Sequence, residues 1–196
     1  MILKGVVWVL GLGPLFWTGF RFLTDDLGAN PIEEVLHLAG RWTLVLLLAG
    51  LSITPVRRLT GWNQIIKVRR LVGLFAFFYA SVHLLLYLGL DQGFAWSYIW
   101  EDVAERPFIT SGVGAFLLLM PLALTSTKGW IRRLGKRWQR LHRLVYPAAV
   151  LGTLHFFWKV KADTFWPLLA ALMLTGLLLI RVPWRRLRKI EGQAGS

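Results

Sequence analysis

Apolar residues along this chain gather into six long runs, which polar and charged segments separate. Each run approaches the length of about 20 residues that an α-helix needs to cross the hydrocarbon core of a bilayer. The runs lack the alternation of apolar and polar residues that membrane barrel strands show. The sequence therefore predicts an all-α integral membrane protein with a six-transmembrane-helix bundle over Ile2–Leu23, Leu36–Thr54, Leu71–Leu90, Phe108–Thr125, Leu141–Trp158 and Phe165–Val182.

Composition supports this interpretation and sets the orientation. Of the 196 residues, 56% are hydrophobic, which is more apolar surface than a soluble domain of this length can bury. If the N-terminus is cytoplasmic, 18 of the 23 Lys and Arg fall on the cytoplasmic side, and nine of the ten Asp and Glu fall on the other. This positive-inside asymmetry predicts that the N- and C-termini are both cytoplasmic.

The net charge of +13 does not point to nucleic acid, because it is confined to one side of the predicted bundle. Basic loops of this kind orient the helices and contact anionic lipid of the bilayer, and a docking surface for a cytosolic partner stays open as an alternative. The chain has no Cys, which excludes disulfides, iron–sulfur clusters and thiolate zinc sites. It also lacks nucleotide-binding glycine motifs. We expect a single membrane domain over residues 1–196.

Two of the four histidines fall at matched depth in the predicted bundle. His83 lies about 18 Å from the cytoplasmic end of the third helix, and His155 lies near the periplasmic end of the fifth. Two intramembrane histidines at one depth favour a shared ligand role over two separate interhelical hydrogen bonds. Zinc and copper would need further ligands, whereas haem iron needs only two axial ligands from the protein. His83 and His155 are thus candidate ligands of haem b, and His142, about 20 Å further inward, is a candidate for a second centre.

Several segments around these histidines resemble one known family. They read FYASVHLLLYL, LGKRWQRLHRLVYPAAVLGTLHFFW, LAGRWTLVLLLAGLSITPVRRL and RRLVGLFAFFYASVH. In combination they are similar to MsrQ (YedZ), the haem-binding membrane subunits of bacterial methionine sulfoxide reductase systems, within the ferric-reductase-like transmembrane superfamily. The resemblance covers nearly the whole chain and aligns His83, His142 and His155 with the family's haem ligands.

The resemblance implies a b-type cytochrome that carries electrons outward across the membrane. Its acceptor would be MsrP, a periplasmic molybdopterin enzyme that reduces oxidised methionine in proteins. The chain stops after RVPWRRLRKIEGQAGS without a flavin domain, so the expected donor is a membrane quinol or a separate cytosolic flavin reductase. The number of haem b groups, one or two, and the presence of bound FMN stay open.

Arg69 occupies a distinctive position in this comparison. The wider superfamily places a second histidine about fourteen residues before the outer one on the third helix, and counting back from His83 leads to Arg69. A helix turns about 100° per residue, so Arg69 lies near the same face as His83. A protonated guanidinium is a poor iron ligand, and Arg69 is better suited to a haem propionate or a lipid phosphate.

His142 and His155 do not share a face of an ideal helix, because thirteen residues rotate it by about 220°. Pro147 lies between them and removes the hydrogen bond to the Arg143 carbonyl, so we expect a kink or a rewound turn there. The apolar macrocycle of haem also matches a wall of aromatic side chains from Phe75, Phe77, Phe78, Phe156, Phe157 and Trp158, although aromatic residues of membrane helices face lipid or the protein core by default.

Two further segments lie on the predicted periplasmic side. A series of polar residues at helical spacing, Glu33, His37 and Arg41, follows the N-cap Asn30. It forms a site for a quinol, a proton or a docking partner, or else a stripe of ion pairs at the membrane interface. The 91–106 loop carries Glu101, Asp102 and Glu105 among aromatic residues, and is either a docking rim for the periplasmic partner or a turn in the membrane interface.

Two other classes of function stay open on the sequence alone. The chain could be a stand-alone transmembrane ferric or quinone reductase, which needs no protein partner. A non-redox transporter usually has broken helices and internal repeats, and neither is evident in the sequence. We therefore expect an electron-transfer subunit without a substrate-reducing site of its own.

Overall fold

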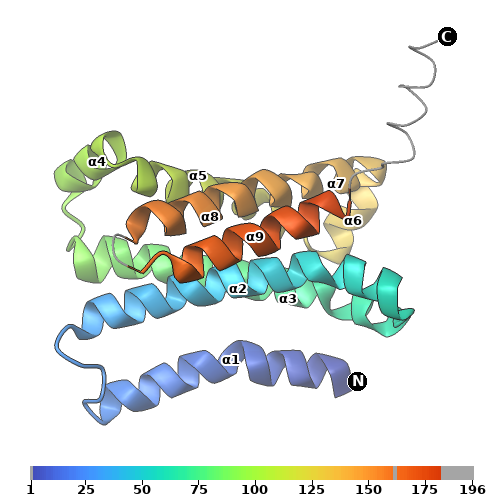
Figure 1. Cartoon of the computed structure of the whole chain (residues 1–196). Helices are drawn as coiled ribbons and strands as arrows, with labels where there is room; N and C mark the ends of the chain where they lie inside the picture. Colours follow the sequence, from blue (N-terminus) through green and yellow to red (C-terminus); the bar gives the residue numbers. More distant parts are fainter. Residues whose placement is uncertain (1, 161–162, 182–196) are drawn as a thin grey trace.

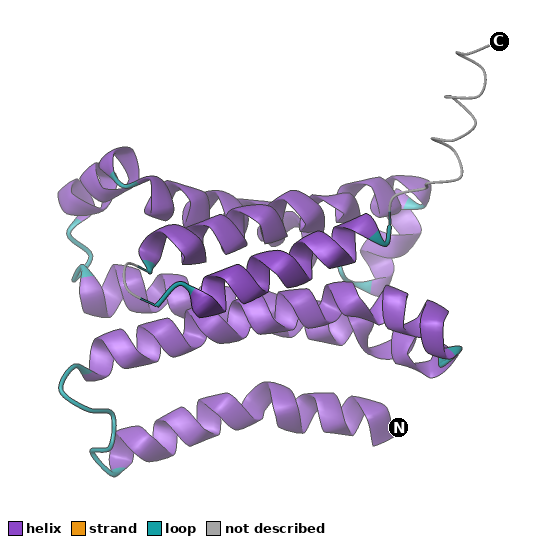
Figure 2. Cartoon of the chain, viewed as in Figure 1, coloured by secondary structure: helices purple, strands orange, loops and turns teal. Residues whose placement is uncertain are grey.

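The computed structural model describes residues 2–160 and 163–181, and within them every regular element is a helix (Figure 2). The long helices lie roughly side by side along one direction (Figure 1). In chain order the elements are α1 (Ile2–Leu23), α2 (Pro31–Thr60), the 3₁₀ helix η1 (Asn63–Val68), α3 (Arg69–Leu86), the π-helical turn η2 (Tyr87–Asp91), α4 (Trp96–Glu105), α5 (Pro107–Leu124), α6 (Lys128–Leu134), α7 (Lys136–Leu141), the 3₁₀ turn η3 (His142–Leu144), α8 (Val145–Lys159) and α9 (Phe165–Leu179).

The centre of the bundle is made of two helix pairs, α2 with α3 and α5 with α8. Helix α9 packs on α8 and α2, and α1 packs on the outside of α3 (Figure 1). The buried core contains Leu51 of α2, Ala76 and Tyr79 of α3, and Ala148 of α8. The alanines have no exposed surface, which lets neighbouring helices approach closely, as is common in membrane bundles.

Local signals in the sequence explain where the helices begin and end. Asn30 caps α2, because its side chain accepts a hydrogen bond from the backbone N–H of Glu33, and Pro31 occupies the first helical position. Gly61 ends α2 in the left-handed conformation with φ 71°, and its N–H donates to the Arg57 carbonyl. Thr127 caps α6 by accepting from the N–H of Trp130 at 3.3 Å.

The charges separate to the two ends of the bundle. One end holds the turn between α2 and α3 together with α6 and α7, and we call it the basic end (Figure 1). The opposite end holds the loop between α1 and α2 together with α4, and we call it the acidic end (Figure 1). The folded chain therefore keeps the charge asymmetry on which the expected orientation rests.

The expectation of six spans is supported in part. Four helical segments within the described residues are long and apolar enough to cross a membrane: Ile2–Leu23, Pro31–Thr60, Asn63–Asp91 and Pro107–Leu124. The last two expected spans are shorter, because α8 and α9 have 15 residues each. Val182 and the expected cytoplasmic C-terminal tail lie outside the described residues.

The expected fifth span is not one continuous α-helix. It is interrupted by η3, and α8 starts only at Val145, so Pro147 lies in the first turn of α8. The missing N–H of Pro147 is tolerated at this position, because the first N–H groups of a helix have no partner within it. The 3₁₀ turn η3, just before α8, is the rewound turn that we expected from Pro147. The 91–106 segment, which we expected as a loop, contains the helix α4.

Candidate functional site

The imidazole rings of His83 and His155 lie next to each other inside the bundle. Their centroids are 5.9 Å apart, and their planes are nearly perpendicular at 80°. His83 lies in the last turn of α3, and His155 lies near the end of α8, so both are displaced toward the acidic end. The structure thus brings together the two histidines that the sequence placed at matched depth.

Each ring makes one hydrogen bond to the backbone of the facing helix. Nδ1 of His83 is 2.9 Å from the carbonyl oxygen of Leu36 on α2. Nδ1 of His155 is 2.6 Å from the carbonyl oxygen of Phe108 on α5. A carbonyl oxygen can only accept, so Nδ1 carries the proton in both rings. Nε2 therefore keeps its lone pair, and within the described residues no group bonds to it.

Glycine makes this close approach possible on both sides. A Cβ atom on Gly40 of α2 would lie 3.1 Å from Cε1 of His83. A Cβ atom on Gly112 of α5 would lie 2.7 Å from Nδ1 of His155, a separation that real Cβ contacts do not show. Sequence reasoning missed both glycines. The signal that could have found them is that Gly40 and Gly112, like His83 and His155, are 72 positions apart.

The donor set fits a metal group that asks the protein for two nitrogen ligands. The two ring centroids are 5.9 Å apart, and each ring offers one Nε2 lone pair. In the described residues no group of three or more His, Cys, Asp or Glu could hold a metal ion alone. The pair therefore suits haem, which supplies the other four nitrogens, better than zinc.

His142 is in a different environment at the basic end. Its ring stacks on Trp138 with 3.9 Å between centroids, and its Nε2 is 3.3 Å from Oγ1 of Thr125. That hydroxyl also lies 2.6 Å from the Pro121 carbonyl, to which it donates its proton. Nε2 of His142 is then the donor to Thr125, so the free lone pair of this ring is on Nδ1 and not on Nε2 as in His83 and His155. The role of His142 as a haem ligand stays a prediction.

Arg69 lies at the same end and is partly buried. Its guanidinium donates to Oγ1 of Thr54 at 3.3 Å and lies within electrostatic range of His142 and Arg181. Arg181 donates to the Tyr146 hydroxyl at 2.7 Å and to the carbonyl of Leu51. Nε of Arg181 is buried without a hydrogen-bond partner among the described residues. Arg69, His142 and Arg181 thus lie in one region, and no carboxylate among the described residues pairs with them. Such a region suits an acidic group of a ligand. The role of Arg69 at a haem propionate or a lipid phosphate stays a prediction.

The expected aromatic wall is not continuous. Phe75 is buried against α1, where its ring meets Trp8 edge to face at 5.1 Å. Phe77 turns toward α5 and stacks on Phe116 at 5.5 Å. The other expected members differ in burial: Phe156 packs against the core, whereas Phe78, Phe157 and Trp158 are exposed on the bundle surface. Phe157 and Trp158 lie near the end of α8, a position that is typical of aromatic residues at the lipid interface.

His37 lies beside the outer histidine pair without joining it. Its Nε2 is 3.8 Å from Oε1 of Glu33, while Arg41 pairs with Glu34 at 3.3 Å instead of continuing the expected stripe. Nε2 of His37 is buried and has no hydrogen-bond partner in the described residues. The geometry supports an ion pair between Glu33 and His37 and does not bring His37 into contact with His83.

Asp102 is structural, which corrects its expected place on an exposed acidic rim. Its side chain is only 11% exposed, accepts from the Tyr87 hydroxyl at 2.9 Å and pairs with Arg106 at 3.1 Å. It therefore fastens α4 onto the turn that follows α3. Glu101 and Glu105 remain exposed on α4. Within the described residues they have no ion-pair partner.

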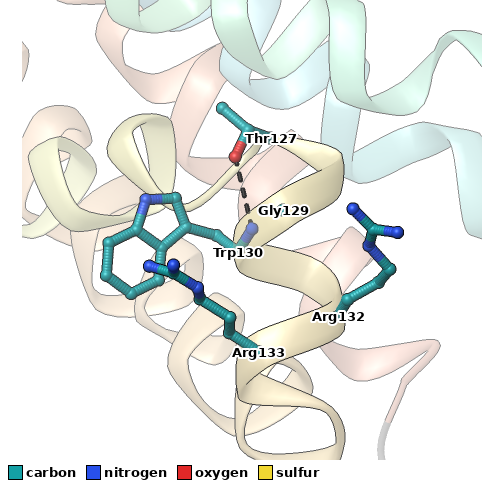
Figure 3. A pocket seen from close by; sticks show the side chains of 5 residues that line it. All are labelled: Thr127, Gly129, Trp130, Arg132 and Arg133. Atoms are coloured by element: carbon teal, nitrogen blue, oxygen red, sulfur yellow. Dashed lines mark hydrogen bonds between the residues drawn. The ribbon is translucent and has the colours of Figure 1, made fainter.

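A surface pocket at the basic end has no part in the histidine site. Figure 3 shows it around α6, where Trp130, Arg132 and Arg133 are among the residues that line it. The guanidinium of Arg133 lies 5.8 Å from the ring centroid of Trp130. Adjacent arginines and a tryptophan at a membrane surface suit anionic lipid headgroups, in line with the expectation for the basic loops.

Comparison with known proteins points to one family. Residues 38–153 match the family described as ferric reductase like transmembrane component. That range includes His83 and His142, with Gly40 and Gly112, and ends two positions before His155. No solved structure matches the chain.

Curated relatives match over most of the chain. A protein of Rhodospirillum rubrum is 54% identical over 191 residues, which cover 97% of this chain and 92% of that protein. A protein of Xanthomonas axonopodis pv. citri is 49% identical over 182 residues, which cover 93% of this chain and 82% of that protein. Both are named protein-methionine-sulfoxide reductase heme-binding subunit MsrQ.

Proposed function

This chain belongs to the ferric-reductase-like transmembrane family and, within it, to the MsrQ haem-binding subunits, and we propose from this premise that it carries electrons outward across the bacterial inner membrane. The donor is a membrane quinol or a cytosolic flavin reductase. The acceptor is MsrP, the periplasmic molybdopterin enzyme that repairs oxidised methionine in proteins. The observation that carries this proposal is the pair of neighbouring imidazoles whose Nδ1 atoms are hydrogen-bonded to carbonyls and whose Nε2 atoms have no hydrogen-bond partner among the described residues.

We assign His83 and His155 as the two residues that would hold one haem b through their Nε2 atoms. Haem supplies a reversible one-electron carrier when it is bound. The two Nδ1–H groups donate to the Leu36 and Phe108 carbonyls, which fixes each ring and raises its basicity as a ligand. Both histidines are half-buried, and the Phe108 ring lies 6.1 Å from that of His155.

The orientation that we propose has six crossings, with the basic end in the cytoplasm. Helix α9 has 15 residues and rises about 22 Å, which is less than the thickness of about 30 Å of a typical hydrocarbon core. Helix α9 still packs along α8 and α2. The three residues of η3 lengthen the helical segment that contains α8. Local thinning of the bilayer and flanking residues accommodate short spans of this kind.

Electrons then enter at the basic end, where Arg69, His142 and Arg181 gather. We assign Arg69 and His142 to this entry region, because two basic side chains near each other suit an acidic group of a donor, of FMN or of a second haem b. The Arg69 guanidinium serves there as a charge and hydrogen-bond donor and not as an iron ligand.

Electrons leave at the acidic end, close to His83 and His155. Helix α4 presents the exposed side chains of Trp96, Tyr98 and Trp100 together with Glu101 and Glu105. Aromatic residues are enriched at protein interfaces, and exposed acids steer a basic partner surface. We propose this face of α4 as the region that MsrP approaches.

Removal of either axial histidine tests the assignment. The purified variants His83→Ala and His155→Ala should lose the b-type spectrum and most of their haem in a pyridine haemochrome assay, because each ring supplies one of only two protein ligands. His37→Ala is the matched control, since it removes a neighbouring histidine outside the pair and should keep the wild-type haem content. A six-coordinate b-type spectrum in either the His83 or the His155 variant would refute the pairing.

A further inference from the structure

The two central helix pairs repeat the same arrangement around their histidines. In α2 and α3, His83 bonds to the Leu36 carbonyl and lies against Gly40. In α5 and α8, His155 bonds to the Phe108 carbonyl and lies against Gly112. Every member of the first set is 72 positions before its counterpart in the second: Leu36 and Phe108, Gly40 and Gly112, His83 and His155.

Other positions of the two pairs follow the same spacing. Ala76 and Ala148 are 72 positions apart, and neither has exposed surface. Ser81 and Thr153 each precede their histidine by two positions, and each hydroxyl donates to the carbonyl four residues earlier at 2.9 Å. Few residues are identical between the two pairs, so the repeat is weak in the sequence, where the shared spacing of the histidines and glycines is its main trace. The folded chain shows that the spacing corresponds to equivalent contacts.

Helix geometry explains why a glycine belongs in this arrangement. The carbonyl of residue i and the Cα atom of residue i+4 lie on adjacent turns of the same helical face. The Leu36 carbonyl already accepts the N–H of Gly40 within α2, as the Phe108 carbonyl accepts that of Gly112 within α5. The Phe108 carbonyl also accepts from the Ser111 hydroxyl at 2.8 Å, so His155 shares this acceptor with a hydroxyl whereas His83 does not share Leu36 in this way. An imidazole that bonds to either carbonyl must cross the space where the side chain of residue i+4 would start. Only glycine leaves that space empty.

We propose that Gly40 and Gly112 are positioning residues of the histidine site. Each glycine forms, with the carbonyl one turn before it, a seat that holds one imidazole with Nδ1 protonated and Nε2 free. The two seats are equivalent positions of a repeated helix pair, and together they orient the His83 and His155 rings. This inference rests on the proposed haem function and deepens it.

The two seats differ in how tightly they are closed. A Cβ atom would lie 2.7 Å from Nδ1 of His155 at position 112, but 3.1 Å or more from His83 at position 40. Gly112→Ala must therefore displace the ring from the Phe108 carbonyl, whereas Gly40→Ala needs a shift of a few tenths of an ångström. Loss of an outer-shell partner of a metal-binding histidine typically weakens metal binding by about 10- to 100-fold. We expect a loss in this range for Gly112→Ala and a smaller one for Gly40→Ala.

Gly114→Ala and Gly152→Ala are the matched controls. A Cβ atom on Gly114 of α5 would lie 3.2 Å from Cδ1 of Leu151, so this variant crowds the same helix pair without touching a histidine. Gly152 of α8 has no atom within 4 Å of an added Cβ, and alanine favours the helix there. Both controls should keep the haem affinity and the redox midpoint of the wild type.

The experiment measures haem affinity, the reduced-minus-oxidised spectrum and the redox midpoint of each purified full-length variant. The proposal is supported if Gly112→Ala, with or without Gly40→Ala, binds haem more weakly and has a shifted redox midpoint. Both control variants must then keep the wild-type affinity and midpoint. Equal losses in Gly112→Ala and Gly114→Ala would show that position 112 acts only through helix packing and would overturn the proposal. So would a wild-type affinity and midpoint in Gly112→Ala.

A second readout separates this inference from the haem function itself. Solid-state NMR of the haem-free protein labelled with ¹⁵N-histidine should show His155 protonated at Nδ1, and Gly112→Ala should remove that signal. Wild-type protein that binds no haem but shows this tautomer would refute the proposed function and keep the seats. A wild-type His155 without a proton at Nδ1 would overturn the seats whatever the haem content.

Discussion

Asp102→Asn is the substitution for which the structure allows the most quantitative expectation. The Asp102 carboxylate accepts from the Tyr87 hydroxyl at 2.9 Å and from Nε of Arg106 at 3.1 Å, and it is nearly buried. Asparagine keeps the shape and one acceptor oxygen but removes the charge. The substitution therefore weakens the bond to Tyr87 and turns an N–H₂ group or a neutral oxygen toward Arg106.

The expected cost follows from these contacts. A hydrogen bond to a charged group contributes about 1.5–3 kcal/mol. The pair with Arg106 adds at most about 1 kcal/mol, because the Arg106 side chain is 57% exposed and solvent screens it. Asparagine retains part of the first contribution, so we expect a local destabilisation of about 1.5–3 kcal/mol. Since about 1.4 kcal/mol corresponds to a tenfold change, helix α4 should open on the order of 10- to 100-fold more often.

Hydrogen–deuterium exchange with mass spectrometry measures this opening directly on peptides that cover α4. Glu101→Gln and Glu105→Gln are the controls, because each removes a charge from the same helix at an exposed position and should change the local free energy by less than about 0.5 kcal/mol. A double-mutant cycle with Tyr87→Phe isolates the pairwise contribution. Exchange of α4 in Asp102→Asn at the wild-type rate, or equally fast exchange in the Glu101 control, would refute this account.

Two further predictions concern the path of electrons and the orientation of the bundle. His142→Ala should leave the haem of His83 and His155 in place while slowing its reduction from the basic end, as stopped-flow spectra would show; an unchanged rate and haem content would demote His142 to a structural residue. Because the chain has no Cys, single cysteines in Glu101→Cys and Gln139→Cys report sidedness, and an impermeant maleimide added to intact spheroplasts should label only the Glu101 variant. Labelling of the Gln139 variant alone would invert the proposed orientation.

The length and apolarity of the runs determined most of the membrane architecture by themselves. A run of this kind has few stable states besides a helix in lipid, so four spans and the all-helical fold follow from local sequence. Depth along a helix depends only on its start and its rise per residue, which is why His83 and His155 were matched before the fold was known. The rewinding before Pro147 was predictable for the same local reason.

Only the tertiary structure decided how side chains meet across helices. Charge and spacing made Asp102 look like a rim acid, but its burial depends on how α4 folds back onto Tyr87. The periodicity of α3 likewise does not determine that Phe75 packs against α1 instead of a cofactor. The rotation of α3 about its own axis is set by the helices that pack against it. Each seat, at Gly40 and at Gly112, consists of a backbone carbonyl and a position without a side chain. A pattern of hydrophobic and polar positions contains neither feature. Their role becomes clear only when the fold places a histidine of the facing helix against them.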